Sequence, residues 1–253
     1  MGLGAKRKTG GDTGAMGRVE REPEMGMAGP RVDAGGPPTR LLDSEAVLRE
    51  GVAALTRCDP LMARLVAEGA TPPLRKRPPG YEGLAGIIVA QQLSTASAGA
   101  IWGRLRALLR DVTPETVAAA AEADLRAAGL SGPKIRTLRA VAEAVAAGDL
   151  PLPALHTLPA DEAHRRMVAV RGIGPWTADV YLLFCLGHPD AFPAGDLALQ
   201  EAARLAEGLD ARPSAAALAA RAQAWRPWRG VAAKVLWAYY RVAKARDGAP
   251  LAP

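Results

Sequence analysis

From about residue 40 onward, apolar side chains recur at steps of three and four residues, which is the spacing of one face of an α-helix. Leu, Ala and Val occupy most of these positions, and Arg is frequent between them. We find no convincing run of alternating apolar and polar residues and no repeat of 20–50 residues. The pattern therefore predicts an all-α domain of roughly ten helices, arranged in two lobes.

Capping signals support this interpretation. Asp59-Pro60 and Thr113-Pro114 each place a capping side chain before a proline that suits the first helical turn. Ser131 is expected to cap the helix that follows it. The Ala-rich run 117–128 predicts short packed helices.

Residues 1–38 have a different composition, rich in Gly and Pro and poor in large apolar side chains. Such a segment cannot bury enough surface to offset its chain entropy. We expect a disordered tail over 1–38 and a helical domain over 39–248. The tail carries six basic and five acidic residues, so most of the net charge of +6 belongs to the helical part.

The charge and the cysteines restrict the class of protein. A pI of about 9.7 suits a polyanionic partner such as nucleic acid. Cys58 and Cys185 are far apart in the sequence and cannot supply a disulfide framework, a zinc site or an iron–sulfur cluster. This usage fits a reducing, cytoplasmic setting. No apolar run reaches the roughly 18 residues of a membrane span, and no secretory signal is evident.

The most informative stretch is the sequence MVAVRGIGPWTADV at 167–180. It predicts a helix, a tight turn containing Gly172 and Gly174, and a second helix that begins at Pro175. Glycines allow positive φ and let a ligand approach the backbone. The amides of Gly172, Gly174 and Thr177 would point outward from a helix N-terminus and bind a phosphate. An ordinary connection between two helices is the alternative, which the G-x-G pattern alone does not exclude.

Further blocks give this stretch a context. Residues 192–199 read FPAGDLAL, with Asp196 twenty residues beyond Trp176; residues 87–94 read IIVAQQLS, 129–134 read GLSGPK, and 225–229 read WRPWR. Together the blocks resemble the helix-hairpin-helix DNA glycosylase superfamily, and in particular its AlkA-type branch, the 3-methyladenine DNA glycosylases II. The resemblance covers about residues 40–243.

The resemblance implies a two-lobed helical fold with a cleft between the lobes, a hairpin at about 165–187, and no N-terminal β-lobe. It also implies a nucleoid-associated enzyme that acts on double-stranded DNA containing a damaged base, and we expect a monomer. Bifunctional relatives carry a nucleophilic Lys where this chain has Trp176, so no Schiff base could form by their route. We expect no lyase activity, no iron–sulfur cluster and no required cofactor.

The reaction that the resemblance implies is the release of alkylated purines, 3-methyladenine and 7-methylguanine. The nucleotide is flipped out of the duplex, and the glycosidic bond breaks through a cationic sugar. Asp196 matches the catalytic carboxylate, which would stabilise that charge. An N-cap is the alternative role for this Asp, and the two roles can coexist.

The remaining site residues follow from the same resemblance. Trp176 and Trp237 match aromatic pocket residues, which attract a cationic base by roughly 0.5–2 kcal/mol per contact; core packing is their alternative. Val180 stands where the family has another pocket aromatic, and Gly195 where it has an acidic residue. Those changes leave the preferred lesion open.

Two further features concern the DNA and a cation. Gln92 matches the wedge that fills the gap in the stack, and a helix-terminal Gln is the alternative. The backbone carbonyls of Val168, Val170 and Ile173 match positions that hold Na⁺ or K⁺ in relatives.

Other polar residues carry weaker signals. Lys134 is expected to be solvated or to face a phosphate, Arg226 and Arg229 to form structural ion pairs, and Asp179 to interact with the dipole of the second hairpin helix. The three histidines show no metal-ligand spacing and are expected at the surface or in loops: His156, His164 and His188.

Two other functions stay open at this point. One is a non-catalytic helix-hairpin-helix module that binds DNA or tethers partners. The other is a glycosylase for deaminated or oxidised bases.

Overall fold

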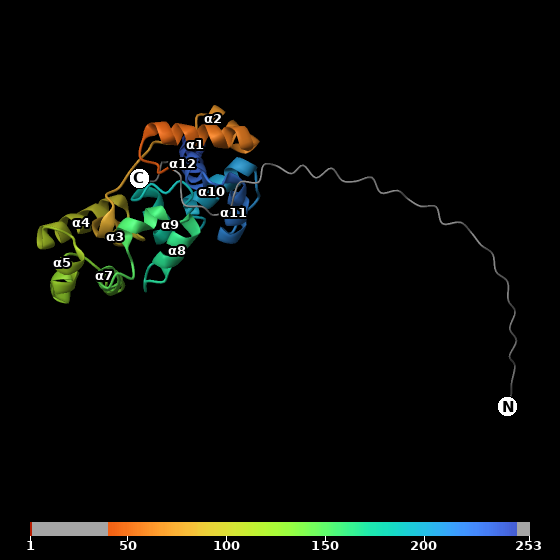
Figure 1. Ribbon diagram of the computed structural model, residues 1–253. Coiled ribbons are helices and arrows are strands. Elements are labelled where there is room, and N and C mark those ends of the chain that lie inside the picture. The colour runs from red at the N-terminus through yellow and green to blue at the C-terminus, as the bar shows by residue number, and fades with distance from the viewer. Residues whose placement is uncertain (2–39, 247–253) are drawn as a thin grey trace, which may run out of the picture. The chain divides into compact units, whose positions relative to one another are not determined.

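The computed structural model describes Met1 and residues 40–246, and within this range it contains twelve α-helices, two 3₁₀-helices and no strand (Figure 1). The expectation of an all-α fold is confirmed. The predicted tail at 1–38 lies outside the described residues, as do the last residues of the predicted domain. None of the described helices is long and apolar enough to cross a membrane. The elements are α1 (Glu45–Cys58), α2 (Pro60–Ala67), α3 (Gly80–Ala90), α4 (Thr95–Leu109), α5 (Pro114–Ala119), α6 (Glu122–Ala127), α7 (Gly132–Ala146), η1 (Leu152–Thr157), α8 (Ala160–Val168), α9 (Pro175–Phe184), α10 (Leu197–Glu207), α11 (Ala215–Ala222), η2 (Gln223–Trp225) and α12 (Arg229–Arg246).

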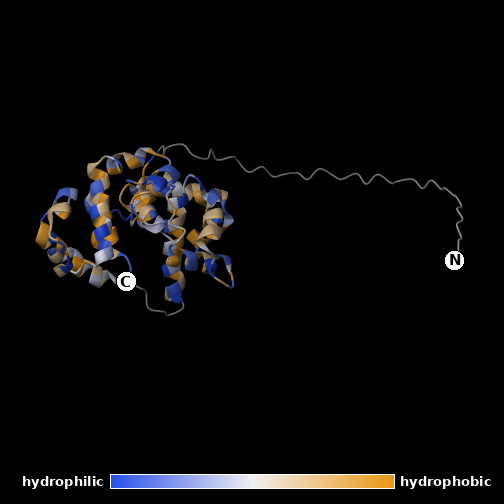
Figure 2. Cartoon of the chain, turned by 90° about the horizontal axis from the view of Figure 1, so that it is seen from below, coloured by the Kyte–Doolittle hydropathy of each residue, from blue (hydrophilic) through white to orange (hydrophobic). Residues whose placement is uncertain are grey.

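The most extensive packing occurs within two sets of helices. In the first set, α12 contacts α1, α2, α10 and η2. In the second, α3 contacts α4, α7, α9 and η1, while α8 packs on α9. Most helices carry both hydrophobic and hydrophilic residues (Figure 2), so each can bury one side against its set.

The helix starts agree with the sequence signals at two of three positions. Asp59 caps α2 through a bond from the amide of Leu61, and Thr113 forms a reciprocal capping box with Thr116. Ser131 occupies the N-cap position of α7, but its side chain makes no capping hydrogen bond, so that expectation is wrong. The Ala-rich run is divided between α5 and α6, which raises the helix number above the expected ten.

Asp59 also joins elements that are distant in sequence. Its Oδ2 accepts hydrogen bonds from the guanidinium of Arg221, 2.7 Å away, and from Nε1 of Trp225, 2.6 Å away. Trp225 is buried, with 1% of its surface exposed. Burial by itself raises the pKa of the Asp59 carboxyl, but the donors on Trp225 and Arg221 outweigh it and hold the pKa below its usual value.

We expect Asp59→Asn to lower the free energy of unfolding at pH 7 by about 2–4 kcal/mol, because it leaves two donors with one neutral partner. A lowered pKa in the folded state means that this stability is fully present above about pH 4 and is lost as the pH falls through the folded pKa. The difference between wild type and variant should therefore narrow in acid. Urea unfolding at pH 7 and pH 3 measures it, with the exposed Asp149→Asn as control. Equal stability of the two variants at pH 7 would contradict the assignment.

Candidate active site

Asp196 lies at the junction of three helices. It is the N-cap of α10, and its Oδ1 accepts the amide of Leu199 at 2.9 Å. The indole Nε1 of Trp237, on α12, donates to the same oxygen at 3.1 Å. The indole Nε1 of Trp176, on α9, donates to Oδ2 at 2.8 Å. The N-cap role is therefore real, and the carboxylate is also held in one orientation by side chains from two other helices.

The carboxylate borders a cavity of about 360 Å³. Trp176, Val180 and Phe184 line it from one face of α9, and Trp237 lines it from α12. The structure thus brings together the four residues that the sequence assigns to the catalytic site and base pocket. The other lining residues are Ile87 and Ala90 of α3 and the loop residues Arg75, Lys76 and Arg77.

The sequence analysis did not identify two groups of residues that line this cavity. Phe184 follows Trp176 and Val180 at a further step of four residues, so helical spacing alone could have identified it. Its ring lies 5.6 Å from that of Trp237, centre to centre. Arg75, Lys76 and Arg77 belong to a proline-rich loop without periodicity, and nothing in the sequence indicates which way they face.

The hairpin consists of α8, a turn and α9. Gly172 has φ +93°, and a Cβ at this position would come within 2.2 Å of Oγ1 of Thr137, so only glycine fits. Gly174 has φ −84°, which any residue can adopt. A Cβ on Gly174 would meet no atom within 4 Å. Gly174 therefore faces open space at the N-cap of α9, where a ligand could approach.

The start of α9 has the donors that an anion requires. Pro175 is the first helical residue, and the first-turn amides have no acceptor within the helix. Thr177 is buried, and its hydroxyl accepts a hydrogen bond from Nε2 of Gln91 at 2.7 Å. The predicted phosphate contact uses the backbone amide of Thr177, so this side-chain bond does not compete with it.

Gln92 follows the end of α3 in a left-handed conformation, with φ +57°, and is exposed. The ammonium of Lys134 donates to the carbonyls of Val89, at 2.6 Å, and Gln91, at 2.9 Å. Two of the three N–H donors of the partly buried Lys134 thus bond to carbonyls at the end of α3, a contact that the expectation of a solvated or phosphate-facing charge did not include. Lys134 fixes the break in the chain from which the candidate wedge emerges.

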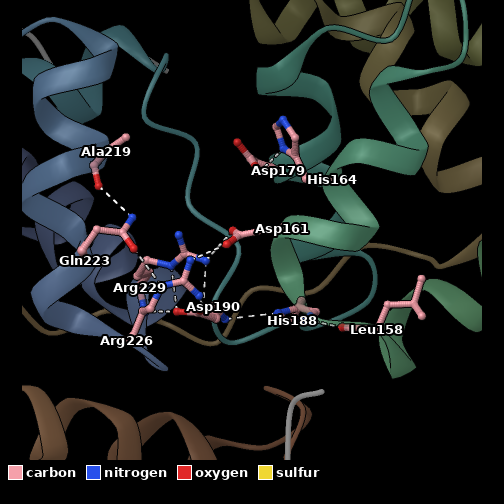
Figure 3. A network of polar contacts seen from close by, with 10 residues as sticks. All are labelled: Leu158, Asp161, His164, Asp179, His188, Asp190, Ala219, Gln223, Arg226 and Arg229. Atoms are coloured by element: carbon pink, nitrogen blue, oxygen red, sulfur yellow. Dashed lines mark hydrogen bonds and ion pairs between the residues drawn. The ribbon is translucent and has the colours of Figure 1, made fainter. Parts of the chain in front are cut away.

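The loop before Asp196 is held by a buried ionic network (Figure 3). Asp190 accepts from Nε and Nη2 of Arg229, at 2.9 and 2.8 Å, and from Nη1 of Arg226 at 2.8 Å. Asp161, on α8, accepts from both arginines. The prediction that Arg226 and Arg229 are structural ion-pair partners is confirmed. The amide of Gly230 adds a bond to the carbonyl of Pro189 at 2.7 Å.

Two histidines have surroundings that the sequence does not indicate, although His188 lies in a loop as expected. His188 lies in a loop but has only 1% of its surface exposed. The amide of Asp190 donates to its Nδ1, so Nε2 carries the proton and donates to the carbonyl of Leu158 at 3.0 Å. Burial lowers the pKa of His188 and favours this neutral form.

His164 is partly buried and lies 2.8 Å from Asp179, nitrogen to oxygen. The hydrogen bond to Asp179 raises the pKa of His164, while burial raises the pKa of Asp179. Asp179 lies in the second turn of α9, so this pairing, and not the dipole of a first turn, accounts for its position.

These contacts define what the site can do chemically. It offers one oriented carboxylate beside a cavity lined by three aromatic rings and three basic side chains, and the described residues contain no cluster of three or more side chains suited to a metal ion. A carboxylate in such surroundings stabilises a positive charge that develops next to it.

Comparison with known proteins gives a consistent result. Residues 85–228 match the model of the HhH-GPD superfamily of base excision DNA repair proteins. The chain is 31% identical over 168 residues to DNA-3-methyladenine glycosylase 1 of Schizosaccharomyces pombe, which covers 65% of this chain and 73% of that protein. It is 34% identical over 208 residues to a probable bifunctional transcriptional activator and DNA repair enzyme AlkA of Mycobacterium tuberculosis, of which it spans 41%.

Among solved structures, a 3-methyladenine DNA glycosylase of S. pombe in complex with abasic DNA superposes with a TM-score of 0.65 at 29% identity. The superposition covers 74% of this chain and 95% of that one. The family model spans more than half of the sequence, and the hairpin and Asp196 both lie inside the matched region. This chain belongs to the HhH-GPD superfamily of base excision DNA repair proteins.

Proposed function

We propose that the protein is a monofunctional DNA glycosylase that releases 3-methyladenine and 7-methylguanine from duplex DNA by hydrolysis. The observation that carries this proposal is the carboxylate of Asp196, held by Trp176 and Trp237 at the wall of a cavity. Trp176 lies at the start of α9, directly after the hairpin turn. The names of the S. pombe relatives support the same class of substrate, and one of them was solved with abasic DNA.

The reaction follows from where the charge develops. A damaged nucleotide leaves the stack, its base enters the cavity, and its sugar lies beside Asp196. As the glycosidic bond breaks, the base takes the bonding electrons and the sugar becomes an oxocarbenium-like cation. The carboxylate stabilises that cation, and a water molecule then adds to the sugar carbon and releases a proton to solvent. The indole donors keep the carboxylate in place throughout, so little reorganisation is needed.

The cavity wall favours a planar cationic base. Alkylation of a ring nitrogen makes a purine cationic and a better leaving group. The rings of Trp176, Trp237 and Phe184 offer stacking and cation–π attraction, roughly 0.5–2 kcal/mol per contact. Among the described residues, Asp196 is the only acid that lines this cavity.

Binding of the duplex would use the hairpin turn and the residue after the end of α3. The amides of Gly172, Gly174 and Thr177 would hold a phosphate at the start of α9. Gln92 would fill the space left in the stack. We further propose that the protein works as a monomer and in the cytoplasm.

We also propose that the hairpin turn takes a monovalent cation, Na⁺ or K⁺. Among the described residues, no N–H group bonds to the carbonyl of Val168 or Ile173, while Val170 accepts one bond, from Ile173. Carbonyls at a helix end lack helical donors, so these three oxygens suit such a ligand. A bound cation would offset the charge of the phosphate.

We expect Asp196→Asn to lower the rate of base release by at least a hundredfold, because the transition state loses its counter-charge. Asn is an equally good N-cap, so α10 should persist. Base release from methylated duplex DNA, resolved by chromatography, measures the rate. Binding to an abasic duplex should survive and serves as the control. Undiminished base release by the variant would exclude the assigned role of Asp196. If the wild type released deaminated or oxidised bases in preference to alkylated ones, the substrate class would be a different one.

We expect no covalent trapping of the protein on abasic DNA by borohydride, because Trp176 replaces the lysine that bifunctional relatives use. A known glycosylase/lyase treated in parallel provides the positive control. A stable adduct at a comparable yield would show that another amine acts as a nucleophile, and the monofunctional assignment would fail.

The two hairpin glycines should respond differently to alanine. Gly172→Ala forces a side chain into a left-handed backbone and onto Thr137, so it should destabilise the fold by about 1–2 kcal/mol or more. Gly174→Ala should leave the thermal midpoint almost unchanged but weaken DNA binding about tenfold, because a methyl group then covers the anion site. Thermal unfolding and fluorescence anisotropy measure the two effects. Wild-type affinity of Gly174→Ala would argue against a phosphate at this turn.

A further inference from the structure

A second cavity, of about 340 Å³, adjoins the base pocket. The two cavities share Arg75, Phe184 and Trp237 in their walls. The second is bounded by the loop at 73–75, the end of α9, the start of α10 and one face of α12, and its remaining polar residues are Lys234, Tyr240 and Arg241. The described residues therefore supply this cavity with three cations and no acid.

Lys234 is an unusual residue for this position. It has 5% of its surface exposed, and its ammonium lies 4.3 Å from the ring centre of Phe184. The carbonyl of Leu74, at 2.8 Å, is its only hydrogen-bond acceptor among the described residues. Burial lowers the pKa of Lys234 to about 8, and the charge of Arg75 acts in the same direction. A methionine would fill the same space without a desolvation penalty, so a charge here calls for a role beyond packing.

The loop that carries Arg75 is held in a specific conformation. Arg75 has φ +33°, which is uncommon for a residue with a side chain and is often found at functional sites. The carboxylate of Glu45 accepts from the amide of Leu74 at 3.2 Å, and the amide of Arg77 donates to the carbonyl of Phe184 at 2.8 Å. In the described structure, Arg75, Lys76 and Arg77 form no ion pair. The loop is thus fixed so that cations without counter-charges border both cavities.

The position of these cations relative to the hairpin is informative. The hairpin turn lies at the N-terminal end of α9, and Phe184 is the last residue of that helix. A helix of ten residues is about 15 Å long. An anion in the second cavity and an anion at the turn would therefore lie at opposite ends of α9, while Asp196 contacts this helix through Trp176.

We propose that Arg75, Lys234 and Arg241 form a subsite for one phosphodiester of the strand that carries the lesion. This phosphodiester and the one at the hairpin lie on opposite sides of the extruded nucleotide. Guanidinium groups suit phosphate because their paired donors match its oxygens. The rings of Trp237 and Tyr240 offer faces for the adjoining sugar or base. The subsite rests on the proposed placement of the deoxyribose against Asp196.

The test uses duplexes that contain one abasic-site analogue and one neutral methylphosphonate, moved along both strands. Affinities are measured by fluorescence anisotropy over a range of salt concentrations for wild type, Arg75→Gln and Lys234→Met. Arg49→Gln is the matched control, since Arg49 is exposed on α1, forms no ion pair with any described residue and lines neither cavity. Thermal unfolding verifies that each variant is folded.

We expect the wild type to lose about five- to tenfold in affinity when one particular phosphate of the lesion strand is neutralised. Arg75→Gln and Lys234→Met should each bind the duplex with this phosphate neutralised as tightly as they bind the unmodified duplex. When a phosphate at the hairpin is neutralised instead, both variants should lose as much affinity as the wild type. Each should also reduce the slope of log affinity against log salt by about one. Arg49→Gln should keep the wild-type response at that phosphate.

The proposal is overturned if both variants keep the wild-type salt slope and the wild-type loss at every methylphosphonate position. It is also overturned if the sensitive phosphate belongs to the undamaged strand. Arg75 is exposed, so Arg75→Gln carries the test even if Lys234→Met fails to fold. Binding is measured without base release, so failure of the subsite can be told apart from failure of the proposed catalysis.

Discussion

The carboxylate of Asp196 accepts three N–H donors, and the arrangement of the site depends on those bonds. The amide of Leu199 fixes the carboxylate at the start of α10, while Trp176 and Trp237 connect it to α9 and α12. Each indole acts twice, because its N–H orients the carboxylate and its ring lines the cavity. The base pocket and the charge that stabilises the sugar are therefore positioned together, and a shift of any one helix would disturb both.

The loop that ends at Asp196 is buried over much of its length, and Ala191 and Phe192 pack in the hydrophobic core. Polar contacts add to this restraint: Asp190 bonds to Arg226 and Arg229, and His188 bonds to the carbonyl of Leu158. Buried ion pairs add little net stability compared with apolar packing, but breaking one is costly because a charge is left unpaired. Such a network therefore specifies one conformation of the loop more than it strengthens the fold. A site that depends on a single carboxylate requires one fixed conformation of the loop that carries it.

Helical spacing, which is a local signal, was sufficient for the helical fold, and the residues that meet at Asp196 followed from the resemblance to a known family. The sequence was insufficient where a contact between distant segments decides the outcome. His188 is buried because Leu158 offers it a carbonyl, and Lys134 is occupied because α3 ends beside it. The requirement for glycine at 172 comes from Thr137, which lies 35 positions earlier in the sequence. Arg75 is the clearest case, since its left-handed conformation depends on partners of Leu74 and Arg77 elsewhere in the fold.

The charges around the cavity present an apparent conflict that DNA binding can resolve. A cationic base should be repelled by Arg75, Lys76 and Arg77, which border the same cavity as the aromatic rings. These side chains are exposed, so solvent and salt already weaken their effect. If a phosphodiester lies between Arg75 and Lys234, it also neutralises part of the positive charge at the wall, and the carboxylate of Asp196 then dominates the potential felt by the base. On this argument the strand contributes to its own recognition, because a flipped nucleotide brings its neutralising phosphate with it and a free alkylated base does not.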